Sequence, residues 1–289
     1  GACVGNRAGA FNIGQEGQVL IGAMLAVFVG LRMPGPPILV ITISAVAGAV
    51  AGGLWAGVSS FLHRIRGVNV VVSTLLMSFI AVQLVSYVVS VPWLLQEPKT
   101  DASSTAANQS AIIPDDYRLP SFGQYPNLSI NIGLIIAIVL TVVVALLLAR
   151  SRWGFTIGMV GRNPLTAQHA GVRVALVSAA ALMVSGACAG LAGAVVVEGA
   201  VYRLQPAVSN NFGWDGLLVA LIARNRPMLA IPVAIVFGAL RTGSAFLAAT
   251  GVPVYLVNVV QSLLVFACVI APALTFAQAR LSKNAQETS

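Results

Sequence analysis

The sequence predicts an all-α protein, a polytopic bundle of transmembrane helices, and two observations lead to that prediction. Hydrophobic residues make up 58% of the chain and charged residues only 8%, whereas a soluble domain usually carries about 25% charged residues to keep its surface in water. Apolar runs such as 130–149, 174–197 and 254–277 are also about as long as a helix that crosses a bilayer, roughly 20 residues. Strands of a membrane β-barrel would be about ten residues long and would alternate apolar and polar side chains.

Eight apolar segments follow one another along the chain, and two of them are too short to span a membrane alone. A helix of about 13 residues reaches about 20 Å, against a hydrocarbon core of roughly 30 Å. We therefore expect 19–31 and 213–223 to be extended by the polar, glycine-containing stretches before them. The products would be broken helices whose backbone faces protein or a water-filled path. The eight segments are 19–31, 37–60, 68–91, 130–149, 174–197, 213–223, 228–247 and 254–277.

Two of the longer segments are rich in small residues, at the spacing that lets helices approach closely. Gly48 and Gly52 are four residues apart in one segment, as are Gly186 and Gly190 in another. Such small-xxx-small pairs are typical of helix interfaces in membranes. They predict a closely packed bundle and indicate nothing about substrate.

The distribution of arginine predicts the orientation in the membrane. The loop 150–173 carries four arginines and no acid, so we expect it on the cytoplasmic side. If each successive span places the next loop on the opposite side of the membrane, eleven basic residues lie on the cytoplasmic side and five on the outer side. The long polar stretch 92–129 and the loop near 198–212 then face outward.

The charged, cysteine and histidine residues exclude several other classes of protein. The net charge is +8, but the basic residues lie at the ends of apolar runs, which is a topology signal rather than a nucleic-acid-binding face. The cysteines and histidines are far apart in the sequence, so they predict no disulfide framework, metal site, cofactor site or catalytic group. These residues are Cys3, Cys188, Cys268, His63 and His169.

One motif occurs twice and predicts an internal repeat. Asn12-Ile-Gly-Gln-Glu-Gly17 matches Asn211-Phe-Gly-Trp-Asp-Gly216, each with Asn, Gly, an acid and Gly in register. A second pair follows in the same order, Asn69-Val-Val-Val-Ser73 and Asn258-Val-Val-Gln-Ser262. The offsets of 199 and 189 residues relate both pairs by nearly the same register.

The predicted topology makes these repeats antiparallel. The loop 61–67 is basic and inside, whereas its counterpart near 242–253 is nearly uncharged and outside. Inverted repeats built around broken helices are a transporter architecture. Two full spans precede the second copy, but only eleven residues precede the first, and the chain begins with Gly1 rather than Met. We expect about two further helices upstream, giving five plus five in the complete protein.

This organisation divides the chain into four parts. They are the remainder of the first inverted repeat at 1–91, an extracytoplasmic loop at 92–129, the second inverted repeat at 130–277 with a cytoplasmic coupling loop at 150–173, and a cytoplasmic tail at 278–289.

Several motifs together resemble one family. They are Phe11–Gln18, Asn69–Leu76, Gly154-Phe155, Gly161-Arg-Asn-Pro164 with Ala170-Gly171, and Gly213-Trp-Asp-Gly216 with Arg224-Asn-Arg-Pro227. Over essentially the whole chain they resemble the permeases of the ABC importer superfamily, which includes branched-chain amino acid, ribose and nucleoside transporters. The Asn-Ile-Gly-x-Glu-Gly-Gln form is most similar to the nucleoside branch.

The resemblance implies a multi-pass permease subunit of the bacterial cytoplasmic membrane. It would pass nucleosides from an extracytoplasmic binding lipoprotein to the cytoplasm by alternating access, driven by a separate ABC ATPase. A second permease, related but not identical, is implied as the other half. A sugar such as ribose, or a branched-chain amino acid, is the alternative substrate.

The chain carries no phosphate-binding loop of its own. Its only lysines are Lys99 and Lys283, and neither follows the glycine-rich spacing of G-x-x-x-x-G-K-[ST]. We therefore expect a transport subunit that is not an enzyme and that depends on another subunit for ATP hydrolysis.

The segment 161–171 fits a rigid cytoplasmic contact for that ATPase. Asn163 can cap a helix with Pro164 in its first turn, and Gly171 can end it. We predict a short interfacial coupling helix, Pro164–Ala170, seated in a groove of the ATPase. The alternative is an ordinary basic loop that only sets topology. The candidate coupling residues are Gly161, Arg162, Asn163, Pro164, Ala167 and Gly171.

Glu16 and Asp215 are the acids of the repeated motif. A charge at mid-bilayer costs at least about 2.5–3.5 kcal/mol on insertion scales, so each acid should lie near an interface or a wet cavity. One interpretation places them at gates of the translocation path. The other is structural: a carboxylate complements a helix N-terminus, for about 0.3–1 kcal/mol.

The remaining candidate path residues are uncharged polar side chains. Asn69 and Ser73 share a helix face, as do Asn258 and Ser262. Such groups can hydrogen-bond a sugar or a base, or bond between helices for about 0.6 kcal/mol each. The full set predicted to line the path or its gates is Asn12, Glu16, Asn69, Ser73, Thr74, Asp215, Asn258 and Gln261.

Three other classes share part of this pattern. A secondary transporter also shows inverted repeats but normally needs an ion or proton site inside the membrane, whereas the acids recognised here are few. A channel would not need a cytoplasmic coupling helix. A membrane-embedded enzyme would need a nucleophile, a base and an orienting group, and no such set is visible.

Overall fold

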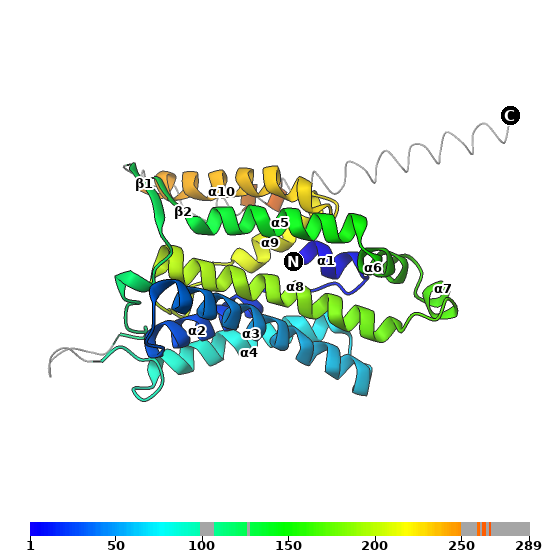
Figure 1. Cartoon of the computed structure of the whole chain (residues 1–289), viewed down its shortest axis with the longest axis horizontal. Helices are drawn as coiled ribbons and strands as arrows, with labels where there is room; N and C mark the ends of the chain where they lie inside the picture. The colour runs from blue at the N-terminus through cyan, green and yellow to red at the C-terminus, as the bar shows by residue number, and fades with distance from the viewer. Residues whose placement is uncertain (99–106, 126–127, 250–258, 261, 264–265, 267–289) are drawn as a thin grey trace. The chain divides into compact units, whose positions relative to one another are not determined.

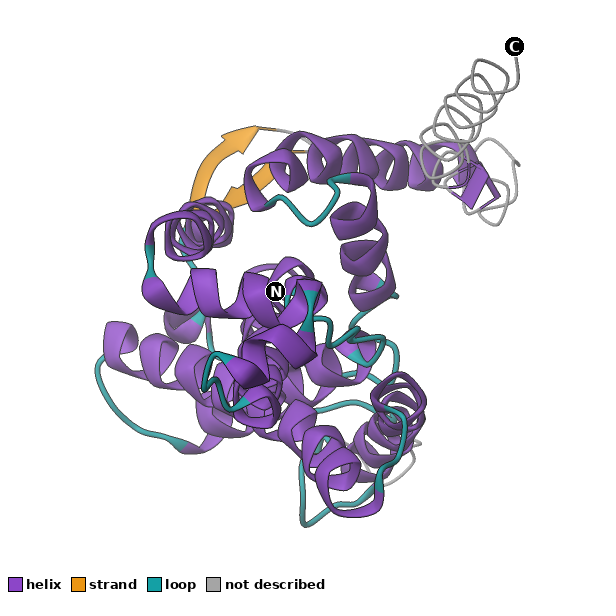
Figure 2. Ribbon diagram, turned by 90° about the vertical axis from the view of Figure 1, so that its right-hand side faces the viewer, coloured by secondary structure: helices purple, strands orange, loops and turns teal. Residues whose placement is uncertain are grey.

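The computed structural model describes residues 1–98, 107–125, 128–249, 259–260, 262–263 and 266. They form two compact units, Gly1–Leu217 and Leu218–Ser289. The division into two repeats at the outer loop, predicted from the sequence, stays a prediction. Nearly all of the regular structure is helical (Figure 1), and the described strands are the short antiparallel pair β1 (Ser121–Tyr125) and β2 (Leu128–Asn131), orange in Figure 2.

Four described helices are long and apolar enough to cross a membrane, which confirms the predicted all-α polytopic bundle. They are α3 (Pro37–Arg66), α4 (Val70–Ser90), α5 (Ile132–Arg150) and α8 (Val174–Val196), the last extended by the π-helical turn η2 (Val197–Val201). The shorter apolar helices are α9 (Phe212–Ile222) and the first part of α10 (Pro227–Ala249). A short 3₁₀ turn, η1 (Asp115–Tyr117), lies in the stretch before β1.

The helix α2 (Gln15–Arg32) packs against α3, α4 and α8 in the first unit (Figure 1). It extends the predicted segment 19–31 at its N-terminal end by four residues, as expected for a helix that needs more length. The short helix α1 (Ala2–Arg7) and the irregular stretch 8–14 precede it. Irregular backbone at membrane depth is tolerated where protein surrounds it, and the residues 12 and 14–23 are all buried.

The helices α2, α3 and α8 meet through glycine, with their backbones in contact. A Cβ atom added to Gly190 of α8 would lie 2.2 Å from the Gly48 carbonyl oxygen of α3, and one added to Gly22 of α2 would lie 2.3 Å from the Gly190 carbonyl oxygen. Gly186 and Gly52 approach in the same way. The predicted small-residue interface is therefore confirmed, and α2 joins it as a third helix.

The predicted coupling loop 150–173 contains two helices rather than one. The expected helix is present as α7 (Pro164–His169), one residue shorter than predicted. Before it lies α6 (Arg152–Arg162), where the sequence predicts a loop. Its Ile157 and Val160 are buried against the bundle, whereas Phe155 is 72% exposed. This helix depends on tertiary packing, because it has only 11 residues and isolated helices shorter than about 12–15 residues are marginal.

Candidate translocation path and coupling surface

Asn12 lies in the irregular stretch before α2 and is completely buried. Its Oδ1 accepts hydrogen bonds from the Gly14 N–H at 3.1 Å and from Gln18 Nε2 at 3.0 Å. Its Nδ2 donates to Gln18 Oε1 at 2.8 Å and to Ser185 Oγ on α8 at 3.0 Å. Both donors and both acceptor positions of this amide are therefore used inside the protein. The arrangement ties the break before α2 to the middle of α8.

Glu16 joins the two copies of the repeated motif. It lies in the first turn of α2, and Oε2 accepts a hydrogen bond from the Gly213 N–H at 2.8 Å, in the first turn of α9. Oε1 accepts a hydrogen bond from the Ser209 hydroxyl. A Cβ atom added to Gly213 would lie 2.3 Å from the Glu16 nitrogen. The carboxylate thus lies at the N-terminal ends of two helices, where negative charge is favoured. That geometry supports the structural interpretation; a gating role stays a prediction.

The candidates on α4 divide into buried and exposed residues. Ser73 and Thr74 are buried, and their hydroxyls donate to the carbonyls of Val70 and Val71 in the same helix. Asn69 is exposed and caps α4, since its Oδ1 accepts from the Val71 N–H at 2.9 Å. Asn69 therefore remains accessible to a ligand, whereas the two hydroxyls do not.

Asn69 lines an open cavity of about 1240 Å³ at the end of the bundle predicted to be cytoplasmic. Phe11, from the stretch before α2, lines it too, together with Arg64 and Arg173. Figure 2 shows the helices of this region from the end of the bundle. The cavity is the best candidate within the described residues for the inner end of a translocation path.

Asp215, another predicted path residue, does not line this cavity. Asp215 lies in the first turn of α9, at the position in its motif that Glu16 has in the first copy. Asn258 and Gln261 lie outside the described residues.

Glu198 is a buried acid that is not among the site residues predicted from the sequence. It lies in η2 at the end of α8 and is 2% exposed. The Ser44 hydroxyl of α3 donates to its Oε1, while Oε2 has no hydrogen-bond partner among the described residues. It lines an otherwise largely apolar cavity of about 560 Å³ between α3, α5 and α8. The available signal was an acid that directly follows the long apolar run 174–197, next to glycine.

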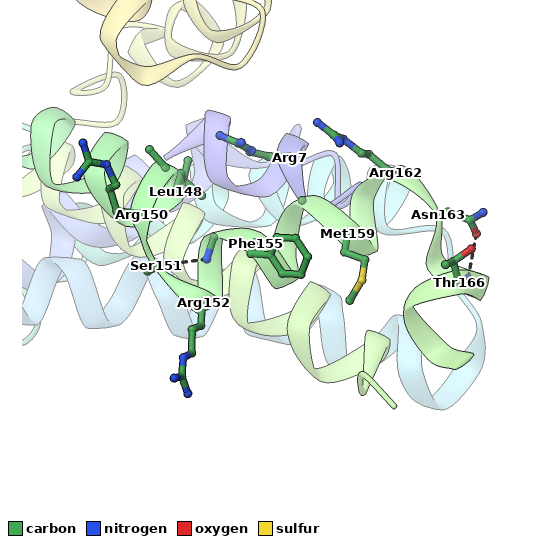
Figure 3. Close-up of a pocket in the computed structure, with 13 residues that line it drawn as sticks. Arg7, Leu148, Arg150, Ser151, Arg152, Phe155, Met159, Arg162, Asn163 and Thr166 are labelled. Carbon is green, nitrogen blue, oxygen red and sulfur yellow. Dashed lines mark hydrogen bonds between the residues drawn. The ribbon is translucent and has the colours of Figure 1, made fainter. Parts of the chain in front are cut away.

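The helix α7 has the capping that the sequence predicts. Asn163 Oδ1 accepts a hydrogen bond from the Thr166 N–H at 3.1 Å (Figure 3), and Gly171 follows the helix with a φ of +80°. Ala167 is completely buried, so it holds the helix against the bundle. Leu165 is 69% exposed and points away from that contact. The exposed face of α7, rather than Ala167, is the surface that a partner could touch.

Gly161, another predicted coupling residue, belongs to the packing that supports α7. A Cβ atom added there would lie 2.1 Å from the Arg7 carbonyl oxygen, at the end of α1. Arg162 ends α6 and is exposed. The six predicted residues therefore share one region, but two of them serve contacts inside the chain. Their coupling role stays a prediction.

Comparison with known proteins identifies the family of this chain. A family model described as branched-chain amino acid transport system, permease component, matches residues 4–269. The guanosine ABC transporter permease protein NupP of Bacillus subtilis is 30% identical over 281 residues, 96% of this chain and 78% of that protein. The glucose ABC transporter permease protein TsgB13 of Haloferax volcanii is 29% identical over 266 residues, 90% and 69% of the two chains.

A third relative is the nucleoside ABC transporter permease protein NupB of Lactococcus lactis, 29% identical over 91% of this chain and 72% of that protein. No solved structure matches. With its apolar spans, the chain is a multi-pass protein of the cytoplasmic membrane. It belongs to the branched-chain amino acid transport system permease family, the membrane-embedded permeases of ABC importers.

Proposed function

We propose that this permease imports nucleosides. The observation that carries the proposal is the similarity, over 96% of the chain, to a relative named as a guanosine permease. A second relative named for nucleosides is similar over 91%. The Asn12–Gly17 motif, which resembles the nucleoside branch, forms the junction of α2 with α8 and α9. A place for this motif beside the translocation path is part of the proposal.

The chain acts together with other subunits. A separate ABC ATPase hydrolyses ATP, a related but non-identical second permease forms the other half of the path, and an extracytoplasmic lipoprotein delivers the nucleoside. Alternating access then moves the substrate inward. The cavity that contains Asn69 is its exit on the cytoplasmic side, where weak polar contacts suffice because selectivity resides in the binding protein.

Sugar import is the second candidate, and one observation favours it. The glucose permease of Haloferax volcanii is 29% identical to this chain, close to the 30% of the guanosine permease. A nucleoside contains a sugar, so hydroxyl-binding groups in the path would serve either substrate. A transport assay with both kinds of substrate therefore distinguishes the two candidates.

Uptake of labelled guanosine, ribose, glucose and leucine separates these candidates. The permease is expressed with its partner subunits in cells that lack their own importers, with the ATPase intact or with its phosphate-loop lysine replaced. We expect guanosine uptake that disappears with the lysine. Guanosine uptake that persists without the lysine would exclude the ATP-driven mechanism. Uptake of ribose, glucose or leucine alone would keep the permease and exclude the nucleoside.

The helix α7 is the contact that transmits ATP hydrolysis to the bundle. The exposed Leu165 of α7 fits an apolar groove on the ATPase. The helix is short and capped, which makes it a rigid contact. Leu165→Asp should lower uptake and ATPase stimulation at least tenfold, because a charge in an apolar contact is left without a partner. Leu165→Met, which keeps the apolar contact, should retain most activity. Uptake and membrane accumulation are measured together; full uptake in Leu165→Asp would refute the contact.

A further inference from the structure

A cavity of about 690 Å³ lies where α5 ends and α6 begins, beside α1. Four arginines from three helices line it, as Figure 3 shows. Arg7 comes from α1, Arg150 from the end of α5, and Arg152 and Arg162 from the two ends of α6. Such a gathering of guanidinium groups favours an anionic ligand.

Among the described residues, no acid forms a salt bridge with these arginines. No acid lines the cavity, and the salt bridge found among the described residues joins Arg118 to Asp115 in a different loop. Figure 3 shows Arg7, Arg150 and Arg162 extending toward one side of α6, whereas Arg152 extends toward the opposite side.

The cavity is also continuous with an apolar, exposed surface. Phe155 and Met159 of α6 line it, and Phe155 is 72% exposed. On α5, directly before Arg150, Leu146 is 56% and Leu147 45% exposed. Because α5 is an apolar candidate span with little of its surface buried in the protein, this face meets lipid chains. A ligand that fits both surfaces has an anionic head and an apolar tail.

We propose that this cavity binds the headgroup of an anionic phospholipid. The arginines of the cavity surround the anionic headgroup, with Arg150 just before one end of α6 and Arg162 at the other, and the acyl chains lie along the exposed leucines of α5. Basic pockets between transmembrane helices on the cytoplasmic side are suited to such headgroups. The lipid would fix α6 at the membrane surface, immediately before the coupling helix α7.

The assembled transporter, purified in detergent, is incubated with phosphatidylglycerol or phosphatidylcholine, and bound lipid is measured by native mass spectrometry. Wild type should retain phosphatidylglycerol preferentially. Arg150→Gln and Arg162→Gln should each weaken that retention about fivefold, since each basic residue near an anionic surface contributes about 1 kcal/mol. Arg66→Gln is the control, because Arg66 is an exposed arginine at the end of α3 that does not line the cavity, and this variant should retain wild-type binding.

Four results would overturn the proposal. Equal retention of the two lipids would show that the headgroup is not recognised. An equal loss in Arg66→Gln would show a general effect of net charge. Displacement of the lipid by millimolar glycerol phosphate would assign the site to a soluble phosphate. If Arg150→Gln and Arg162→Gln kept the lipid but released the ATPase, the cavity would instead be a contact for that subunit.

Discussion

Replacing Gly22 with alanine should destabilise the bundle by about 2–3 kcal/mol, and replacing it with valine should prevent accumulation in the membrane. The added Cβ would lie 2.3 Å from the Gly190 carbonyl oxygen and 2.4 Å from its Cα. Both are backbone atoms, so no rotamer change can relieve the overlap, and the helices must separate. Overpacking of a close-packed interior costs about 1–3 kcal/mol, occasionally more. The purified transporter is heated, and the folded protein that remains at each temperature is measured by size-exclusion chromatography. The shift in midpoint gives the loss of stability.

Gly30 is the matched control on the same helix. A Cβ atom added there meets nothing within 4 Å. Gly30→Ala should leave the unfolding midpoint unchanged or raise it, since alanine is favoured over glycine in a helix interior by about 1 kcal/mol. Equal losses at the two positions would mean that glycine serves helix flexibility here, rather than the contact with α8.

Glu16→Ala should lower the free energy of unfolding by about 3 kcal/mol or more, and it should lower nucleoside uptake in parallel. The carboxylate accepts hydrogen bonds from the Gly213 N–H and the Ser209 hydroxyl, and a hydrogen bond to a charged group is worth about 1.5–3 kcal/mol. Removing it leaves both donors without this partner. Glu16→Gln keeps one carbonyl oxygen, so its stability should lie between alanine and wild type. Unfolding midpoints and nucleoside uptake are measured on the same preparations.

The two interpretations of Glu16 give different outcomes in this series. A structural role makes stability and uptake fall together across Gln and Ala. Loss of uptake in a Glu16→Gln variant of wild-type stability would favour a charged gate. Asp116→Asn, at an exposed acid of η1, removes one negative charge from another loop and should change neither measurement.

Local signals were strong enough to predict several elements. The start and end of α7 are specified by the local backbone preferences of Asn163, Pro164 and Gly171. The helix could therefore be predicted without knowledge of its tertiary contacts. The same holds for the extension of α2, because a bilayer sets the length that a span requires. Glycine spacing on α3 and α8 likewise predicted a close interface.

Tertiary contacts decided what the sequence left open. The amide of Asn12 has the same chemistry whether it meets a substrate or Gln18, and only the fold shows that its partners are internal. The short, glycine-containing α6 has little intrinsic helix preference and is held by its neighbours. Glu198 was missed because one acid after an apolar run gives no indication of Ser44, which lies 154 residues earlier in the chain.

The continuous backbone contact of α8 with α3 and α2 has a mechanical consequence. Only residues 170–173 separate α7 from α8, and α8 cannot bend independently where its glycines lie against two other backbones. A displacement of α7 would therefore move α2, α3 and α8 together as one rigid body. Glu198 lies just beyond the end of α8 that is opposite α7. A displacement that a partner causes at α7 would therefore also displace Glu198.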